Sequence, residues 1–348
     1  MLIVRWLVRH SENPMGMQYA EIALQSAIQA SLPPDVAVER HEISAWAAAR
    51  GPGRTRVPVK ASANRVLGPV LGRALSRGAH VHRFDLRLPP ARDEILTVHD
   101  VAPLLFPDEG ALPRHARSAV NRAQAVVAPS QFSADQIRHH LGVAQVEVVP
   151  NGVDDLFRQG LVATPAQLAG FGIDRPFVLH AGGAGRRKGL DDLAAAWQAL
   201  GRHDLLLVMT GPPHLERDAL FGHLPGTRIL GRRSQPEVAA LMGSANLVVV
   251  PSRHEGFGLP VLEAMASGTP VVTTGGGAIR EVAGDAAETV EQDPEALAVG
   301  MARVVDDAGL RERLVVAGRQ RVERFTWAAA GQAYVHLYRS VWSDDALT

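Results

Sequence analysis

The sequence predicts an α/β protein built from two doubly wound parallel sheets. Short apolar runs alternate with helical patterns along the chain, which is typical of βαβ units. The length of 348 residues fits about two domains, since a domain usually takes ~150 residues. The alternation weakens near residues 150–172, where PNGVD leads into a less regular stretch. We therefore expect Rossmann-like domains at 1–158 and 159–326, followed by a final segment at 327–348.

In the first half, apolar runs predict strands, and the longer amphipathic patterns between them predict helices. Ser133 is a plausible N-cap for the second of these helices, because its hydroxyl can accept a bond from a free backbone N–H. The expected strands are 2–8, 79–84, 95–98, 125–128 and 146–149, and the expected helices are 19–30 and 133–141.

The second half repeats this organisation. Its last pattern, 325–342, predicts a terminal helix with Trp327, Tyr334 and Tyr338 among its apolar anchors. The other expected helices are 190–199, 236–242, 261–267 and 294–305, and the expected strands are 177–180, 205–210, 227–230, 247–250 and 271–274.

The composition excludes several classes of function. There are 36 basic and 36 acidic residues, so no overall positive charge points to nucleic acid as a partner. There is no cysteine, which excludes disulfides and cysteine-based metal sites. The opening MLIVRWLVRH is too charged for a membrane span, and no apolar stretch approaches the ~20 residues that a span needs. We expect a cytoplasmic protein, with peripheral contact to a membrane as an alternative.

The segment 247–274, LVVVPSRHEGFGLPVLEAMASGTPVVTT, carries the most chemical information. A strand leads into a glycine-containing turn, Pro260 fits the first position of a helix, and Gly268 ends that helix. Glu255 is then expected in the loop after the strand, and Glu263 about one turn inside the helix. In open α/β sheets, ligands bind in the crevice at the carboxyl ends of the strands, which is where this loop lies. The free N–H groups at the start of the helix suit a phosphate. An ordinary β-loop-α unit with a surface acid is the alternative.

A second motif, HAGGAGRRKG at 180–189, lies between a predicted strand and a predicted helix. Its glycines let the backbone approach an anion, and Arg186, Arg187 and Lys188 can neutralise a diphosphate. The spacing is not that of a Walker loop. Alone the motif also fits a solvated charged loop, but Lys188 is one of only two lysines in the chain.

Three further sites are weaker. His99 in TVHD ends a predicted strand, where a lone histidine is most often structural. Gly16 closes SENPMG ahead of the first predicted helix, and Leu230 ends a strand in RILGR.

Together these motifs resemble those of the retaining nucleotide-sugar glycosyltransferases of family 4, which have the GT-B fold. The segment 255–272 is similar to the family pattern EGFGLPxxEAMAxGxPVV, the loop 180–189 is similar to GRLxxxKG, and 97–107 is similar to TVHDxxPLxFP. Lys188 matches the family lysine. Gly183 stands where the family arginine is expected, so Arg187 or Arg186 would have to replace it. The resemblance implies two domains facing a cleft and a terminal helix that crosses back to the first domain.

The resemblance also implies roles for particular residues. His99, Glu255 and Lys188 would form the catalytic set, with Glu255 accepting from the sugar and His99 positioning the sugar or the acceptor. Glu263 would bind the ribose, the backbone near Leu230 would receive the base, and Gly16 would touch the donor phosphates or the acceptor. The donor-binding residues would be Gly16, Arg187, Lys188, Leu230, Glu255, Gly256, Phe257, Gly258, Leu259 and Glu263.

The implied activity is transfer of a hexosyl group, with retention, from a nucleotide-diphosphate sugar to a hydroxyl acceptor. UDP-, GDP- and dTDP-linked donors all remain open, as do glycan, lipid-linked and small-molecule acceptors. No Asp-x-Asp pair offers obvious metal ligands, so we expect no metal or other cofactor, with basic side chains compensating the diphosphate charge.

Three alternatives remain from the sequence. A glycoside hydrolase could use Glu255 and Glu263 as an acid/base pair if the two carboxyls faced each other at ~5–10 Å. A GT-B-fold sugar-nucleotide epimerase would need no acceptor, and a sugar-nucleotide-binding module would have lost transfer.

One basic segment stands apart. Residues 50–83 carry seven arginines and one lysine but no acid, a pattern that can contact anionic lipid heads. The alternative is an ordinary solvated surface.

Overall fold

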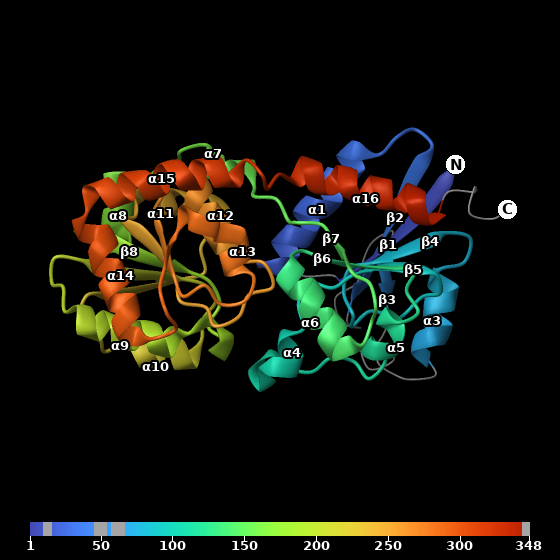
Figure 1. Ribbon diagram of the computed structural model, residues 1–348, viewed down its shortest axis with the longest axis horizontal. Coiled ribbons are helices and arrows are strands. Elements are labelled where there is room, and N and C mark those ends of the chain that lie inside the picture. The colour runs from blue at the N-terminus through green and yellow to red at the C-terminus, as the bar shows by residue number, and fades with distance from the viewer. Residues whose placement is uncertain (10–15, 45–53, 57–66, 343–348) are drawn as a thin grey trace. The chain divides into compact units, whose positions relative to one another are not determined.

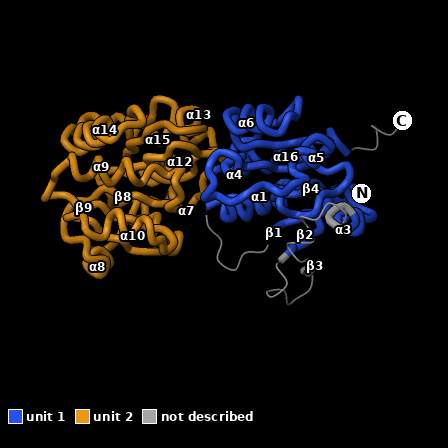
Figure 2. Tube along the Cα trace, turned by 90° about the horizontal axis from the view of Figure 1, so that it is seen from below, with its two compact units in different colours: residues 1–152, 327–348 blue, residues 153–326 orange. Residues whose placement is uncertain are grey.

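The computed structural model describes residues 1–9, 16–44, 54–56 and 67–342. The chain divides into two compact units, which Figure 2 colours separately. Unit 1 comprises Met1–Gly152 together with Trp327–Thr348, and unit 2 comprises Val153–Thr326. The last helix of the chain therefore belongs to the same unit as the first strand.

The described strands of unit 1 form one parallel sheet in the order β3-β2-β1-β4-β5-β6-β7 (Figure 1). The chain winds outward from β1 to one edge through β2 and β3, and then to the other edge from β4 to β7. The winding direction therefore reverses between β1 and β4, and a ligand crevice is expected at the carboxyl ends there. The strands are β1 (Leu2–Arg9), β2 (Val36–Ser44), β3 (Arg54–Arg56), β4 (His80–Arg83), β5 (Glu94–Thr97), β6 (Ala125–Ala128) and β7 (Glu147–Val148).

Helices connect these strands. The second predicted helix begins earlier than expected: its N-cap is Ser130, whose side chain accepts from the backbone N–H of Ser133. The prediction that Ser133 is the N-cap was therefore wrong by one turn, because two serines lie three residues apart. The helices among the described residues of unit 1 are α1 (Met17–Ser31), α3 (Leu67–Leu75), α4 (Ala102–Leu105), η1 (Pro107–Glu109), α5 (Ala116–Val120), α6 (Gln131–Leu141) and α16 (Trp327–Trp342).

The terminal helix α16 packs against α1, as Figure 1 shows. The approach is close at Gly331, where a Cβ atom would lie 2.4 Å from the carbonyl oxygen of Ala27. The predicted return of this helix to the N-terminal half is confirmed.

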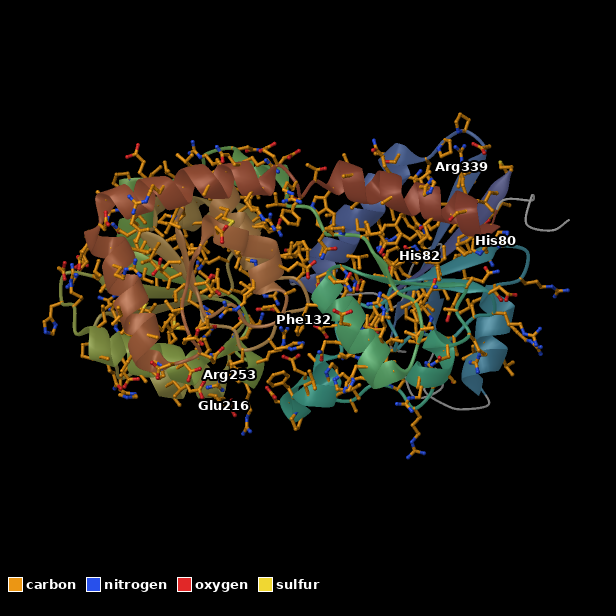
Figure 3. All side chains as sticks on the ribbon, in the orientation of Figure 1. His80, His82, Phe132, Glu216, Arg253 and Arg339 are labelled. Atoms are coloured by element: carbon orange, nitrogen blue, oxygen red, sulfur yellow. The ribbon has the colours of Figure 1, made fainter. Side chains whose placement is uncertain are left out.

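A buried hydrogen-bond chain ties α16 to the sheet. The Tyr338 hydroxyl accepts from Trp6 Nε1 at 3.0 Å and lies 2.6 Å from His82 Nδ1. His82 Nε2 lies 2.8 Å from the hydroxyl of Thr97, which is also 2.8 Å from the Tyr334 hydroxyl. Burial lowers the pKa of His82 well below its usual range, so the ring is neutral within this chain. Figure 3 labels His82.

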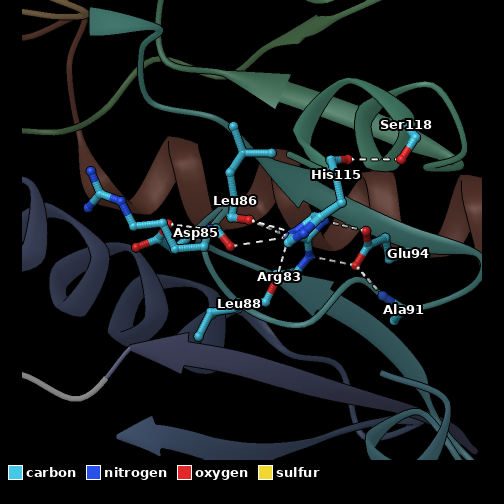
Figure 4. A network of polar contacts seen from close by, with 9 residues as sticks. Arg83, Asp85, Leu86, Leu88, Ala91, Glu94, His115 and Ser118 are labelled. Atoms are coloured by element: carbon cyan, nitrogen blue, oxygen red, sulfur yellow. Dashed lines mark hydrogen bonds and ion pairs between the residues drawn. The ribbon is translucent and has the colours of Figure 1, made fainter. Parts of the chain in front are cut away.

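Another buried network shapes the loop after β4. Arg83 donates to both carboxylate oxygens of Glu94, at 2.8 and 2.6 Å, and also to the backbone oxygens of Leu86 and Leu88, each at 3.1 Å (Figure 4). A buried ion pair holds its geometry when the remaining donors are satisfied, as here. Arg83 was counted in the basic segment 50–83, but it is buried and is not part of a basic surface.

The rest of that basic segment is only partly described. Arg73 on α3 and Arg77 just after it are exposed. Residues 50–53 and 57–66, with Arg50, Lys60 and Arg65, lie outside the described residues. No helix among the described residues is long and apolar enough to span a membrane.

Unit 2 contains a second parallel sheet, with its described strands in the order β10-β9-β8-β11-β12-β13. Here the winding reverses between β8 and β11, which are direct neighbours. The strands are β8 (Phe177–Ala181), β9 (Leu206–Thr210), β10 (Thr227–Gly231), β11 (Leu247–Val250), β12 (Val271–Thr273) and β13 (Glu288–Thr289).

The central strands of unit 2 are fully buried on both faces. Alternate residues of β8 and β11 enter two separate apolar clusters: Leu179 and Val248 enter one, and Val178 and Val249 the other. The helices that cover the sheet are α7 (Asp155–Arg158), α8 (Pro165–Gly170), η2 (Arg186–Lys188), α9 (Leu190–Leu200), α10 (Leu215–Phe221), α11 (Gln235–Ser244), α12 (Leu259–Ala266), α13 (Ile279–Ala283), η3 (Gly284–Ala286), α14 (Pro294–Asp306) and α15 (Ala308–Val322).

Candidate functional site

The loop after β8 brings the predicted basic residues to the reversal point of the unit 2 sheet. It ends in the short helix η2, and Gly189 then adopts a φ of 64° as the N-cap of α9. A Cβ atom at Gly189 would lie 2.1 Å from the carbonyl oxygen of Pro251. Glycine is therefore required here for two reasons, its left-handed backbone and the close passage of the loop after β11.

The loop after β11 carries Glu255 and leads into α12. Gly258 caps this helix with a φ of 97°, so that Leu259 is its first residue and Pro260 its second. The prediction that Pro260 occupies the first position was wrong by one residue, although proline is tolerated in either because neither N–H has a partner within the helix. Gly268, with a φ of 75°, follows the end of α12 as expected.

Backbone and side-chain bonds join the two loops. The carbonyl oxygen of Arg187 accepts from the N–H of Arg253 at 2.8 Å and from that of His254 at 3.3 Å. The side chain of Arg253, labelled in Figure 3, donates to Asp191 at 2.7 Å and to Asp192 at 2.9 Å. These contacts fix the start of α9 against the loop that carries Glu255.

Glu255 is the centre of this arrangement. Its carboxylate accepts from Lys188 Nζ at 2.6 Å, from Arg187 Nη1 at 2.8 Å and from the Ser252 hydroxyl at 2.8 Å. The Glu255 residue is only 6% exposed. Burial alone would raise its pKa, but Lys188 and Arg187 outweigh burial and hold the pKa of Glu255 at about 2. The carboxylate is thus ionised, and two cations converge on it.

Arg186 and Arg187 differ in their surroundings. The Arg187 side chain is half-buried and faces Glu255, whereas Arg186 is exposed. Both belong to η2, and as consecutive residues of a helical turn they project in different directions.

Glu263 has the opposite electrostatic character. It lies in α12, one turn in, as predicted. Burial, with a further contribution from the charge of Asp154, raises the pKa of Glu263 to about 7. Asp154 accepts from the N–H of Leu156 at the start of α7. The charge that raises the pKa of Glu263 is therefore that of Asp154.

The remaining predicted donor-site residues of unit 2 are placed as follows. The ring of Phe257 is buried and meets Phe325 edge-on at 5.8 Å, so only its backbone can face a ligand. Gly256 and Gly258 are buried in the same turn, and Leu259 is half-buried. The carbonyl oxygen of Leu230 accepts from Arg233 at 2.6 Å.

The predicted residues of unit 1 are Gly16 and His99. Gly16 precedes α1, and its carbonyl oxygen accepts from the N–H of Ala20 at 3.1 Å. The other residues of that loop, 11–15, lie outside the described residues. His99 follows β5, and its Nε2 lies 3.4 Å from Oε1 of Glu21 on α1. Glu21, Ser252 and Asp154 had not been predicted from the sequence.

Among the described residues, no group of three or more His, Cys, Asp or Glu side chains is arranged to hold a metal ion.

Comparison with known proteins gives the family. Residues 5–155 match the family described as Glycosyltransferase Family 4, and residues 175–307 match Glycosyl transferases group 1. The chain belongs to glycosyltransferase family 4. Within this family it is similar to D-inositol 3-phosphate glycosyltransferase of Xylanimonas cellulosilytica, with 30% identity over 239 residues, 63% of this chain. It is also similar to an MMP alpha-(1->4)-mannosyltransferase of Mycolicibacterium hassiacum, with 40% identity over 110 residues, 30% of this chain.

The matched regions are 57% and 27% of those two relatives' own lengths, so the chain spans well under two thirds of either. Solved structures show the fold. Sucrose-phosphate synthase of Thermosynechococcus elongatus superposes with a TM-score of 0.76 at 19% identity, covering 100% of both chains. Anabaena HepE, in complex with UDP and glucose, gives 0.74 at 18% identity, covering 98% of this chain and 100% of that one. The predicted GT-B fold is confirmed.

Proposed function

We propose that the protein is a retaining glycosyltransferase that moves a hexosyl group from a nucleoside-diphosphate sugar to a hydroxyl acceptor, without a metal ion. The observation that carries this proposal is the convergence of Lys188 and Arg187 on Glu255, where the loops after β8 and β11 meet. Ligands of open α/β sheets bind at such a reversal point. Two cations beside a helix start suit a diphosphate, and a carboxylate beside them suits sugar hydroxyls.

In this proposal the donor binds to unit 2. Its diphosphate lies at Lys188, Arg187 and the backbone N–H groups of Gly258 and Leu259, which begin α12. Arg187 is favoured over Arg186 as the replacement for the family arginine missing at Gly183, because Arg187 already faces Glu255. The base lies near Leu230, and Glu263 accepts from the ribose hydroxyls.

The mechanism follows from the charges. When the bond from the sugar to the diphosphate breaks, negative charge grows on the departing phosphate oxygen and positive charge on the sugar. Lys188 and Arg187, held in place before the reaction, stabilise the first of these charges without reorganisation. The acceptor hydroxyl attacks on the face that the diphosphate leaves, and the leaving phosphate oxygen takes its proton.

Glu255 fits a sugar-binding role better than a nucleophilic or acid role. With a pKa of about 2, it holds no proton to donate. Its two oxygens are held by Lys188 and Arg187, which lowers its nucleophilicity. A hydrolytic pair needs two carboxyls that sense each other across one sugar, whereas Glu263 is shifted by burial and Asp154. The charges around the two carboxyls therefore favour transfer over glycoside hydrolysis.

The test is a donor survey. The purified protein is incubated with UDP, GDP and dTDP in turn, with EDTA present, and its melting temperature is measured. We expect one nucleoside diphosphate to raise it by several degrees. The corresponding sugar donors are then assayed for nucleotide release with glycan, lipid-linked and small-molecule acceptors. Hydrolysis of simple glycosides without nucleotide, or no response to any nucleotide, would contradict the proposal.

A further inference from the structure

A buried carboxylate in unit 1 lies beside the histidine that the proposed reaction uses. Glu21 Oε1 is 3.4 Å from His99 Nε2, and the two side chains are only 7% and 11% exposed. The residues come from different elements: Glu21 is the fifth residue of α1, and His99 follows β5.

The position of Glu21 is unusual for a carboxylate. It stands on the core face of α1, next to Ala20 and on the same buried face as Leu24 and Ile28. Burying a carboxylate is costly unless it is paired. The pairing with His99 offsets that cost.

The backbone of His99 is fixed independently. Its carbonyl oxygen accepts from the Ser133 hydroxyl at 3.1 Å. The next residue, Asp100, accepts from the N–H of Ala102 at 3.0 Å and so forms the turn that begins α4. With the main chain held on both sides, the ring's remaining freedom is its side-chain rotation, and Glu21 restricts that.

The pairing also selects a tautomer. A carboxylate carries negative charge and accepts only, so Glu21 favours a proton on Nε2 of His99, although the 3.4 Å contact between them lacks hydrogen-bond geometry. In the neutral ring Nδ1 is then a hydrogen-bond acceptor. Burial disfavours the charged ring, but Glu21, then Asp100 and Asp85, outweigh it, so that the pKa of His99 is raised. The neighbouring His82 remains neutral because burial, and the charge of His99, lower its pKa.

We propose that Glu21 is a positioning residue, which holds His99 by Nε2 so that Nδ1 accepts a hydrogen bond from a substrate hydroxyl. This rests on the proposed function, in which His99 contacts the sugar or the acceptor. Glu21 and His99 would then act on the substrate from unit 1, as Lys188 and Arg187 do from unit 2. Activity must then rise with pH as His99 loses its second proton, and the carboxylate of Glu21 sets where this rise occurs.

The experiment uses Glu21→Gln, which keeps the shape of the side chain but removes its charge. Glu39→Gln is the matched control, because Glu39 is also an ion-paired acid of unit 1, bound to Arg5 at 3.0 Å. Histidine signals of the full chain are followed by NMR from pH 5 to 9, with His99→Asn to assign the signal. The pH dependence of kcat/KM for transfer is measured on the same proteins.

We expect Glu21→Gln to lower the pKa of His99 by about half a unit or more, since a neighbouring charge shifts a pKa by about this much. The acid limb of the kcat/KM profile should move to lower pH by the same amount, with kcat/KM at least about tenfold lower on the plateau. Glu39→Gln should leave both the pKa of His99 and the kcat/KM profile unchanged.

Two results would overturn the inference: an unchanged His99 pKa in Glu21→Gln, or a lowered pKa with an unmoved activity profile. Melting temperature and nucleotide binding of Glu21→Gln show whether the variant is folded. If it is not, Glu21→Asp, which keeps the charge, must retain the raised pKa or the inference fails. Failure of the proposed function is distinct, since the wild type would then transfer no sugar whatever the NMR titration shows.

Discussion

The Nζ atom of Lys188 lies 2.6 Å from Oε1 of Glu255, so that a cation after β8 and a carboxylate after β11 neutralise each other at the sheet reversal. Arg187 completes the arrangement on the other carboxylate oxygen. In the proposed function, Glu255 and the diphosphate of the donor would therefore compete for the same two cations.

Replacing Lys188 with alanine should nearly abolish transfer. In the proposed mechanism the variant loses one of two cations that face the developing phosphate charge, and removal of such a group costs about 10²–10³-fold in kcat. Steady-state nucleotide release measures the effect. Arg202→Ala is the control, because Arg202 is ion-paired with Asp204 and Asp306 on the same unit without facing Glu255. Similar losses of kcat in both variants would contradict the assignment of Lys188 to the departing phosphate.

Glu255→Gln should separate binding from turnover. The amide no longer neutralises Lys188 and Arg187, so the affinity for the nucleoside diphosphate should rise by about tenfold, whereas transfer should fall because the sugar loses a charged acceptor. Calorimetry with the free nucleotide and a transfer assay give the two values. Glu216→Gln, on an exposed acid of α10 labelled in Figure 3, should change neither. Weaker nucleotide binding by Glu255→Gln would refute the idea that Glu255 and the diphosphate compete for Lys188 and Arg187.

Nucleotide affinity should depend on Glu263. Because its pKa is raised to about 7, Glu263 is protonated below that value and is then a poorer acceptor for ribose hydroxyls. Affinity should therefore fall as the pH drops from 8 to 6. Glu263→Gln separates this effect from protonation of the phosphate, since the variant retains only the latter. Equal pH dependence in both proteins would show that Glu263 does not bind the ribose.

The same group has a predictable effect on stability. A carboxyl whose folded pKa lies above its ordinary value near 4.5 destabilises the fold once the unfolded form ionises and the folded form does not. The penalty grows from pH 4.5 to about 7 and is constant above. Glu263→Gln should thus raise the melting temperature at pH 8 and leave it nearly unchanged at pH 4.5. A gain at pH 4.5 as large as that at pH 8 would rule out this explanation.

Tyr338 on the last helix should matter for unit 1 alone. Tyr338→Phe leaves the buried Trp6 N–H and His82 without their shared partner, which costs about 1–3 kcal/mol. Hydrogen exchange of α16 amides should accelerate accordingly, while nucleotide binding by unit 2 stays the same. Tyr19→Phe, at an exposed position on α1, should have no such effect. Unaltered exchange in Tyr338→Phe would mean that the network does not anchor α16.

Much of the fold could be predicted because buried parallel strands are nearly continuous apolar runs. β11 was predicted to the residue for this reason. β2 was not predicted, because Arg40, His41 and Glu42 interrupt its apolar pattern. It is held instead by its parallel pairing with β1, in which Leu7 lies opposite His41, and such pairing leaves no local signal.

The candidate site also contains residues that the sequence predicts and residues that it does not. Lys188 and Glu255 could be found because glycines and turn residues surround them at a recognisable spacing. Glu21 could not, because an acid followed by Ile22 and Ala23 reads as an ordinary helix position, and its neighbour His99 is far away in the sequence. Ser252 and Asp154 likewise act only through contacts that the fold creates.

Unit 1 consists of two stretches of chain separated by the whole of unit 2. On a ribosome, the residues that complete its interior, among them Tyr334 and Tyr338, emerge only after all of unit 2. All strands of unit 2 are synthesised before α16, so unit 2 can fold while synthesis continues. Unit 1 leaves part of its apolar interior exposed until α16 is synthesised. A nascent chain released before residue 327 would therefore carry a complete unit 2 and a unit 1 whose apolar interior lacks its last helix.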